Sequence, residues 1–217
     1  MPQAAVLNMR GEEVAQIELD AKLFDVELNM DLLHQAVLYI DNNKAQLRGC
    51  TLTRSQISRT GAKMYRQKGL GRARHGDRGA PTFVGGGKAM GPGRERHRLR
   101  MPRKMRRRAL ACALTAQLRK GLIRFVDELR PEEVSTKLMI TALENLRCSR
   151  GKILALVGPE EYYDEVVDKS SRNVPRFILR LAPHVNVRDL LVADHIIMTQ
   201  GALAQMKTLV GGAADVE

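Results

Sequence analysis

The stretch ILALV at residues 153–157 is an uninterrupted apolar run of strand length. Three further runs are nearly as apolar, namely LIRFV at 122–126, FILRL at 177–181 and HIIMT at 195–199. Runs that are apolar at consecutive positions suit strands buried on both faces, as in parallel sheets. The four runs therefore predict the central strands of a mostly parallel sheet.

Helical patterns separate these runs. The most regular one has apolar residues at the 3.6-residue period between Leu138 and Leu146, and shorter ones follow at 162–167, 187–191 and 203–210. Strand–helix alternation at this spacing implies right-handed crossovers with helices on both faces of the sheet. The predicted fold class is α/β, a three-layer α/β/α sandwich with a mostly parallel sheet.

The N-terminal half extends this pattern. Residues 14–19 alternate weakly and predict a strand, paired in a hairpin with 4–9 across the Arg10-Gly11 turn. Asn29 can cap a helix whose apolar stripe ends at Ile40. A further helix is predicted from Pro102 to Gly121, because proline suits a first turn and glycine a C-terminal stop.

The segment 44–108 differs from the rest of the chain. It holds 20 Lys and Arg but two acids, a net charge of +18, whereas the remaining residues hold 16 bases and 22 acids, a net charge of −6. It also holds 11 of the 18 glycines. Such a sequence buries too little apolar surface to offset its ordering entropy. We therefore predict a globular α/β domain at 1–43 and 109–217, interrupted by an extended loop that polyanions order.

The composition indicates which class of partner the protein binds and in which cellular compartment it is expected. The net charge of +12 and pI near 10.1 favour polyanions, with nucleic acid first and an anionic membrane surface second. No run approaches the length of a spanning helix, and the N-terminus lacks the pattern of a secretory signal, so no membrane role is expected. Three widely spaced cysteines indicate neither a disulfide framework nor a thiolate zinc site, and suit a reducing cytosol.

The candidate motifs for nucleotide binding, metal binding and catalysis do not match the required patterns. Gly87-Lys88 is followed by Ala89, which breaks a phosphate-binding loop, and Arg74 stands where a dinucleotide fingerprint starting at Gly69 needs its third glycine. The histidines lack metal-site spacing. The carboxylate pairs 132–133 and 160–161 follow prolines and are predicted in helix first turns, where acids complement the dipole. We expect no catalytic, cofactor-binding or metal-binding residues, and no enzyme.

The basic segment carries the functional signal. Five cations at 103–108 occupy the start of the helix predicted from Pro102, where they oppose the helix dipole and repel one another. Phosphates at this helix end would reverse the sign of both effects. Tyr65 and Phe83 are the only aromatic residues of the segment, and either stacking on bases or packing within the loop fits them. The sequence therefore predicts an RNA-binding protein.

A longer motif makes the prediction specific. Residues 61–76 are GAKMYRQKGLGRARHG, followed by Pro81, the glycine run 85–87 and PRKMRRRAL at 102–110. This order resembles the bacterial-type large-ribosomal-subunit protein L four family over nearly the whole chain. Tyr65 stands where the family usually has Trp, and Leu70 where it usually has Thr.

The resemblance implies a structural constituent of the large ribosomal subunit, ribosome-bound in the cytoplasm and in contact with large-subunit (23S-type) ribosomal RNA. It also implies that the loop helps line the nascent-peptide exit tunnel, beside the nascent peptide and the tunnel protein L twenty-two. The alternatives are a basic regulator that binds messenger leader RNA, and an α/β enzyme that clamps nucleic acid with the loop.

Site residues follow by position. The implied rRNA contacts are Lys44, Arg48, Arg54, Arg59, Lys63, Tyr65, Arg66, Lys68, Arg72, Arg74, Arg78, Lys88, Arg94, Arg96, Arg98, Arg100, Arg103, Lys104, Arg106, Arg107 and Arg108. The implied tunnel-facing tip consists of Arg66, Gln67, Lys68, Gly69, Leu70, Gly71 and Arg72.

Overall fold

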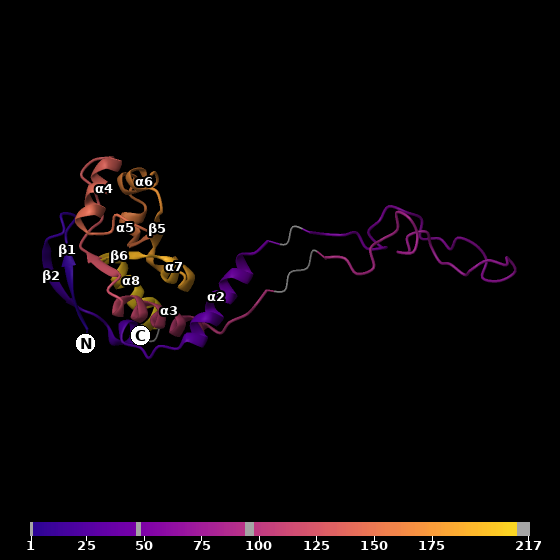
Figure 1. The fold of residues 1–217 in the computed structure, drawn as a ribbon, viewed down its shortest axis with the longest axis horizontal. Coiled ribbons are helices and arrows are strands. Elements are labelled where there is room, and N and C mark those ends of the chain that lie inside the picture. Colours follow the sequence, from indigo (N-terminus) through magenta and orange to yellow (C-terminus); the bar gives the residue numbers. More distant parts are fainter. Residues whose placement is uncertain (1, 47–48, 94–97, 212–217) are drawn as a thin grey trace, which may run out of the picture. The chain divides into compact units, whose positions relative to one another are not determined.

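The computed structural model describes residues 2–46, 49–93 and 98–211 (Figure 1). The chain divides into two compact units. The first, here called the α/β unit, comprises Met1–Asn42 and Arg100–Glu217, and the second, here called the arm, comprises Asn43–Leu99. The second boundary falls earlier than the predicted residue 108, because the cations at 103–108 are already helical and belong to the α/β unit.

The α/β unit is built on one six-stranded sheet with the order β2-β1-β3-β6-β4-β5. Every neighbouring pair is parallel except β1 and β2, which form the predicted hairpin. The strands are β1 (Gln3–Leu7), β2 (Glu13–Glu18), β3 (Ile123–Val126), β4 (Ile153–Val157), β5 (Phe177–Leu181) and β6 (His195–Thr199). The four apolar runs are therefore the four strands at one end of the sheet, and the prediction of a mostly parallel sheet is confirmed.

Helices connect these strands. They are α1 (Ala21–Phe24), α2 (Met30–Lys44), α3 (Arg103–Arg119), α4 (Thr136–Asn145), α5 (Pro159–Tyr162), α6 (Glu165–Ser171), α7 (Val187–Val192) and α8 (Gln200–Gly211), with a 3-10 turn, η1 (Ala182–His184). Asn29 caps α2 as predicted, since its Oδ1 accepts a hydrogen bond from the Leu32 N–H at 2.9 Å. Just beyond α3, Gly121 has φ +69 and ends the helical path as predicted.

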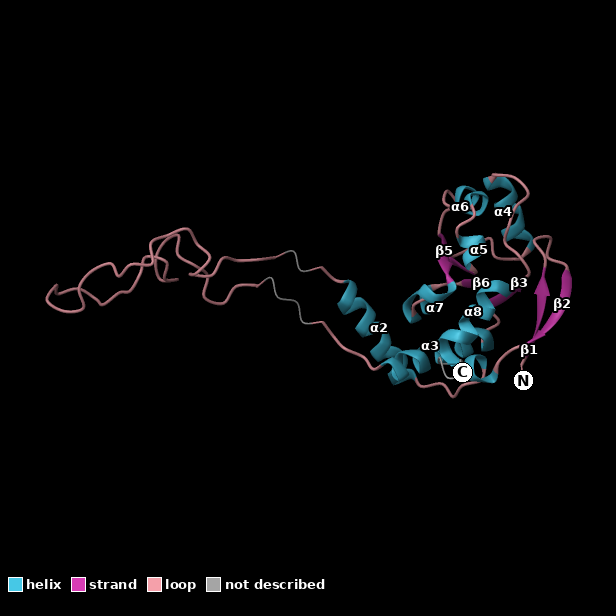
Figure 2. Cartoon of the chain, turned by 180° about the vertical axis from the view of Figure 1, so that it is seen from behind, coloured by secondary structure: helices cyan, strands magenta, loops and turns pink. Residues whose placement is uncertain are grey.

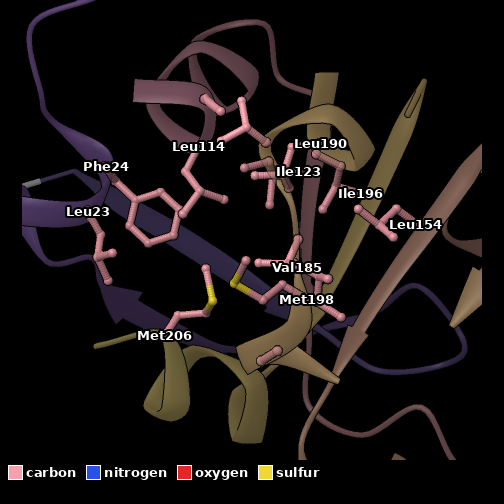
Figure 3. Packing of buried hydrophobic residues seen from close by; sticks show 14 of the residues in the cluster. Leu23, Phe24, Leu114, Ile123, Leu154, Val185, Leu190, Ile196, Met198 and Met206 are labelled. Carbon is pink, nitrogen blue, oxygen red and sulfur yellow. The ribbon is translucent and has the colours of Figure 1, made fainter. Parts of the chain in front are cut away.

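Alternate residues along β4 belong to two separate hydrophobic cores. Leu154 and Leu156 of β4 belong to a cluster with residues of α1, α2, α3, α7 and α8, part of which Figure 3 shows. Ile153, Ala155 and Val157 belong to a second cluster, together with residues of α4. Helices α4 and α6 lie on one side of the sheet and α3, α7 and α8 on the other (Figure 2). The three-layer α/β/α sandwich is confirmed.

One local prediction is wrong. Glu132 and Glu133 do not lie in a helix first turn, because α4 begins only at Thr136. Side chains of other helices hold the preceding segment in a bent path: the Leu129 N–H donates to Glu161 Oε1 at 3.2 Å, and the Ser135 N–H donates to the Ser170 hydroxyl at 3.1 Å. Because these backbone N–H groups bind side chains of other helices, they do not form the hydrogen bonds of a helical turn at the paired acids.

Candidate nucleic-acid interface

The arm is a chain that doubles back on itself without a regular strand or helix in its described residues 49–93 (Figure 2). Backbone hydrogen bonds join its two halves. The Thr51 N–H donates to the Pro92 carbonyl and the Lys88 N–H to the Leu52 carbonyl, both at 2.9 Å. These bonds give the arm a defined path without a hydrophobic core of its own.

Glycines 86 and 87 pack closely against the backbone of the arm, Gly86 within its own half and Gly87 against the opposite half. A Cβ added at Gly87 would lie 2.7 Å from the Thr53 carbonyl carbon, and one added at Gly86 would lie 2.9 Å from the Ala80 carbonyl carbon. Real Cβ atoms do not approach backbone so closely. The absence of side chains at 86 and 87 is therefore required by packing within the arm itself, before any RNA is considered.

The two aromatic residues of the arm also pack inside it. The His75 ring lies 6.3 Å from the ring of Tyr65 and 4.9 Å from that of Phe83, both in edge-to-face geometry. The Tyr65 hydroxyl donates to the Ala73 carbonyl. Of the two roles that the sequence left open, packing within the arm is the one seen for Tyr65 and Phe83.

The predicted tip residues 66–72 form the turn that closes the arm. They lie inside the backbone hydrogen bond from the Met64 N–H to the Gly76 carbonyl, at 3.0 Å. Gly69 and Gly71 have φ of +87 and +59, and a Cβ added at either would meet nothing within 4 Å. Glycine is thus needed at these two positions for backbone conformation and not for space.

The cations of 44–108 lie on the surface. Of its 20 Lys and Arg, Arg48, Arg94 and Arg96 fall outside the described residues, which leaves 17. All 17 are exposed: Lys44, Arg54, Arg59, Lys63, Arg66, Lys68, Arg72, Arg74, Arg78, Lys88, Arg98, Arg100, Arg103, Lys104, Arg106, Arg107 and Arg108.

Almost none of these cations has an acidic partner. Within the described ranges, Arg54 alone among them forms an ion pair, with Asp77 at 2.9 Å. Arg59 instead braces the arm, because its guanidinium donates to the carbonyls of Arg78 at 3.4 Å and Val84 at 3.3 Å. The remaining positive charge has no counter-charge among the residues that the structure describes, and a polyanion is the partner that would supply one.

The cations at 103–108 are held on the α/β unit by the first turns of α3. Pro102 precedes the helix and supplies no side-chain cap, and the first turn contains no acid. The Arg106 guanidinium lies over the ring of Tyr39 in α2, 5.9 Å from its centroid. The sequence did not single out Tyr39, because one tyrosine on an amphipathic helix is no distinctive pattern.

The residues that the structure describes show no centre for chemistry. They contain no group of three or more His, Cys, Asp or Glu that could hold a metal ion. Glu161, half-buried at the carboxyl ends of the parallel strands, accepts hydrogen bonds from the Leu129 N–H, the Gly158 N–H at 3.1 Å and the Thr199 hydroxyl at 2.6 Å. This carboxylate therefore joins the start of α5 to the segment after β3 and to the end of β6. Among the described helices, none has both the length and the apolar character to cross a membrane.

The described residues thus define an α/β protein with an arm of exposed cations, most of which lack an acidic partner. The sequence comparison makes the family explicit: residues 17–209 match the model of the ribosomal protein L4/L1 family, and the chain belongs to that family. It is therefore a ribosomal protein and not an enzyme, and the enzyme alternative is wrong.

Individual relatives agree with the family match. A protein of Pelotomaculum thermopropionicum, named large ribosomal subunit protein uL4, is 38% identical over 95% of this chain and 98% of its own. Proteins with the same name from Natranaerobius thermophilus and Symbiobacterium thermophilum are 37% and 36% identical, over 94% and 97% of this chain and 97% and 100% of their own. The similarity thus extends over both the α/β unit and the arm.

Proposed function

We propose that this protein is a structural constituent of the large ribosomal subunit, ribosome-bound in the cytoplasm, and that it binds large-subunit ribosomal RNA. The observation that carries the proposal is the row of exposed cations without acidic partners along the arm and at the start of α3. RNA phosphates would neutralise this charge and release their condensed counterions, which is the main source of sequence-independent affinity.

The arm supplies the first part of the interface. Its cations, from Lys44 to Arg98, and Arg100 just beyond it are the proposed phosphate contacts, and Arg48, Arg94 and Arg96 are included on the sequence alone. Packing by glycines keeps the arm thin, which suits a chain threaded between RNA helices. Its closing turn, residues 66–72, is proposed to line the nascent-peptide exit tunnel, in contact with the nascent peptide and close to the tunnel protein L twenty-two.

The start of α3 supplies the second part. Arg103, Lys104, Arg106, Arg107 and Arg108 are fixed by the helix, unlike the cations of the arm. Phosphates beside them would complement the helix dipole and accept paired hydrogen bonds from the guanidinium groups. This rigid cluster would therefore orient the α/β unit on the RNA, since such contacts fix position without reading sequence.

The proposal is tested by reversing charge at α3 in the full chain. We expect the Arg106→Glu, Arg107→Glu double variant to fold, because both side chains are exposed, and to be depleted from large subunits after a high-salt wash. Sedimentation of the tagged protein measures its incorporation, and circular dichroism its folding.

A matched control reverses two exposed cations elsewhere on the α/β unit. Lys137 and Arg172 lie on and just after helices of the opposite layer, and neither is in the proposed interface. The Lys137→Glu, Arg172→Glu variant should be incorporated normally. Equal retention of both double variants at wild-type level would show that the α3 cations are merely solvated.

A further inference from the structure

A cavity of about 420 Å³ lies in the α/β unit between α2, α3 and the segment that joins η1 to α7. Its apolar wall includes Ile40 of α2, Leu110 of α3 and Val185. The half-buried ring of Tyr39 also faces the cavity. The volume falls within the range of roughly 300–1,000 Å³ that is typical of sites for small organic groups.

The rim of the same cavity is cationic. Arg103, Arg106 and Arg107 line it, all three are exposed, and no Asp or Glu is among the lining residues. In the part of the chain that the structure describes, none of the three forms an ion pair. The cavity therefore combines a flat aromatic ring and an apolar wall with three guanidinium groups that lack acidic partners.

A polar group faces the cavity as well. Asn186 lines it, immediately before α7, and its side chain makes no capping hydrogen bond to that helix. An asparagine amide offers two donors and an acceptor, which is the hydrogen-bonding pattern that base edges require.

We propose that this cavity binds one unstacked nucleotide of the ribosomal RNA. The base lies against Tyr39 and the apolar wall, Asn186 contacts its edge, and the phosphate pairs with Arg103 and Arg107. The inference rests on the proposed function and deepens it, because it assigns a base-reading site to an interface otherwise made of phosphate contacts. Proteins read RNA mainly at unstacked bases, which pack on aromatic rings or guanidinium planes.

The positive charge at the rim of the cavity favours a nucleotide over a segment of a neighbouring protein as its occupant. An apolar side chain would fill the wall but leave three guanidinium groups at the rim without a counter-charge. A nucleotide satisfies both parts at once, since it joins a flat apolar ring to a phosphate.

Photocrosslinking of the full chain tests the inference directly. Large-subunit rRNA transcribed with 4-thiouridine is bound to the protein and irradiated, and the crosslinked peptides are identified by mass spectrometry. We expect crosslinks to Tyr39 or to residues 183–187, in addition to any in the arm. Crosslinks confined to the arm would overturn the nucleotide site alone, whereas failure to bind the rRNA at all would overturn the proposed function.

Substitution of Tyr39 gives a second readout, the dissociation constant for the same rRNA. Tyr39→Ala should weaken binding between about 5-fold and about 100-fold, as expected for loss of one stacked base, while Tyr39→Phe keeps the ring and should stay within about 2-fold. Tyr163→Ala, at a tyrosine that is 75% exposed beside α5, is the matched control and should bind normally.

If Tyr39→Ala does not fold, a variant that fills the cavity tests the inference instead. Asn186 is half-buried and caps nothing, so Asn186→Trp can occupy the cavity with little effect on the core. It should weaken rRNA binding to a similar degree. Wild-type affinity of the folded Asn186→Trp variant would overturn the inference.

Discussion

The proposed role of the arm predicts how the affinity for rRNA responds to salt. Arg72 and Arg74 are exposed and have no acidic partner among the described residues, so both are available to phosphates. Arg54 is different, because Asp77 already neutralises it at 2.9 Å. We therefore compare the Arg72→Gln, Arg74→Gln variant with the Arg54→Gln, Asp77→Asn variant, which removes an internal ion pair and leaves the net charge unchanged.

The size of the effect follows from counterion release. If about ten of the cations contact phosphates, the logarithm of the binding constant falls with the logarithm of salt concentration at a slope of roughly −7 to −9. Each contact contributes about 0.7–0.9 to that slope, so loss of two makes it shallower by about 1.4–1.8. At about 0.15 M salt, the same loss weakens binding roughly 15- to 30-fold.

Binding of the full chain to large-subunit rRNA, measured by fluorescence anisotropy over about 50–200 mM monovalent salt, gives both quantities. The variant at 72 and 74 should show the shallower slope, and the variant at 54 and 77 the wild-type slope. Identical slopes for all three proteins would refute the argument that unpaired cations of the arm contact phosphates.

Three further predictions concern the integrity of the fold. In the protein bound to rRNA, Gly87→Ala should force the two halves of the arm apart and abolish amide-exchange protection across it, whereas Gly61→Ala, where an added Cβ meets nothing within 4 Å, should leave protection unchanged. Glu161→Gln should lower the free energy of unfolding by about 2–3 kcal/mol in urea denaturation, because the amide keeps only one acceptor oxygen and one of the two backbone donors faces its NH2 group instead, while Glu160→Gln at the exposed neighbour should change it by less than about 0.5 kcal/mol. Burial raises the pKa of the Cys148 thiol and closes it to reagents, so it should resist alkylation at neutral pH until the protein unfolds; modification of Cys148 in the native protein would contradict this.

The fold class was accessible from the sequence because its signals are local. The run ILALV at 153–157 is apolar at every position, and in the structure each face of β4 contacts a separate core. Asn29 and Gly121 mark helix ends through chemistry that involves only neighbouring residues. The prediction for the paired acids at 132–133 was wrong, because two residues distant in sequence, Glu161 and Ser170, position the segment around them.

The candidate interface was only partly accessible. The number of its cations follows from the sequence. Which of them acids elsewhere in the chain neutralise does not: among the described cations of the interface, only Arg54 has an acidic partner, Asp77. The role of Tyr65 also stayed open until its ring was seen to pack edge-to-face on His75. Tyr39 was missed because a half-buried tyrosine in an amphipathic helix has no distinctive pattern, and the guanidinium over it comes from another helix.

By itself, the sequence determined the layers of the α/β unit and the sign and location of the charge, since apolar periodicity and ionisation belong to individual residues and their near neighbours. Only the tertiary structure decided that Gly87 packs against the backbone of Thr53 in the opposite half of the arm, and that three arginines of α3 and a tyrosine of α2 surround one cavity. Both arrangements join residues far apart along the chain, and packing against the rest of the fold sets their distances.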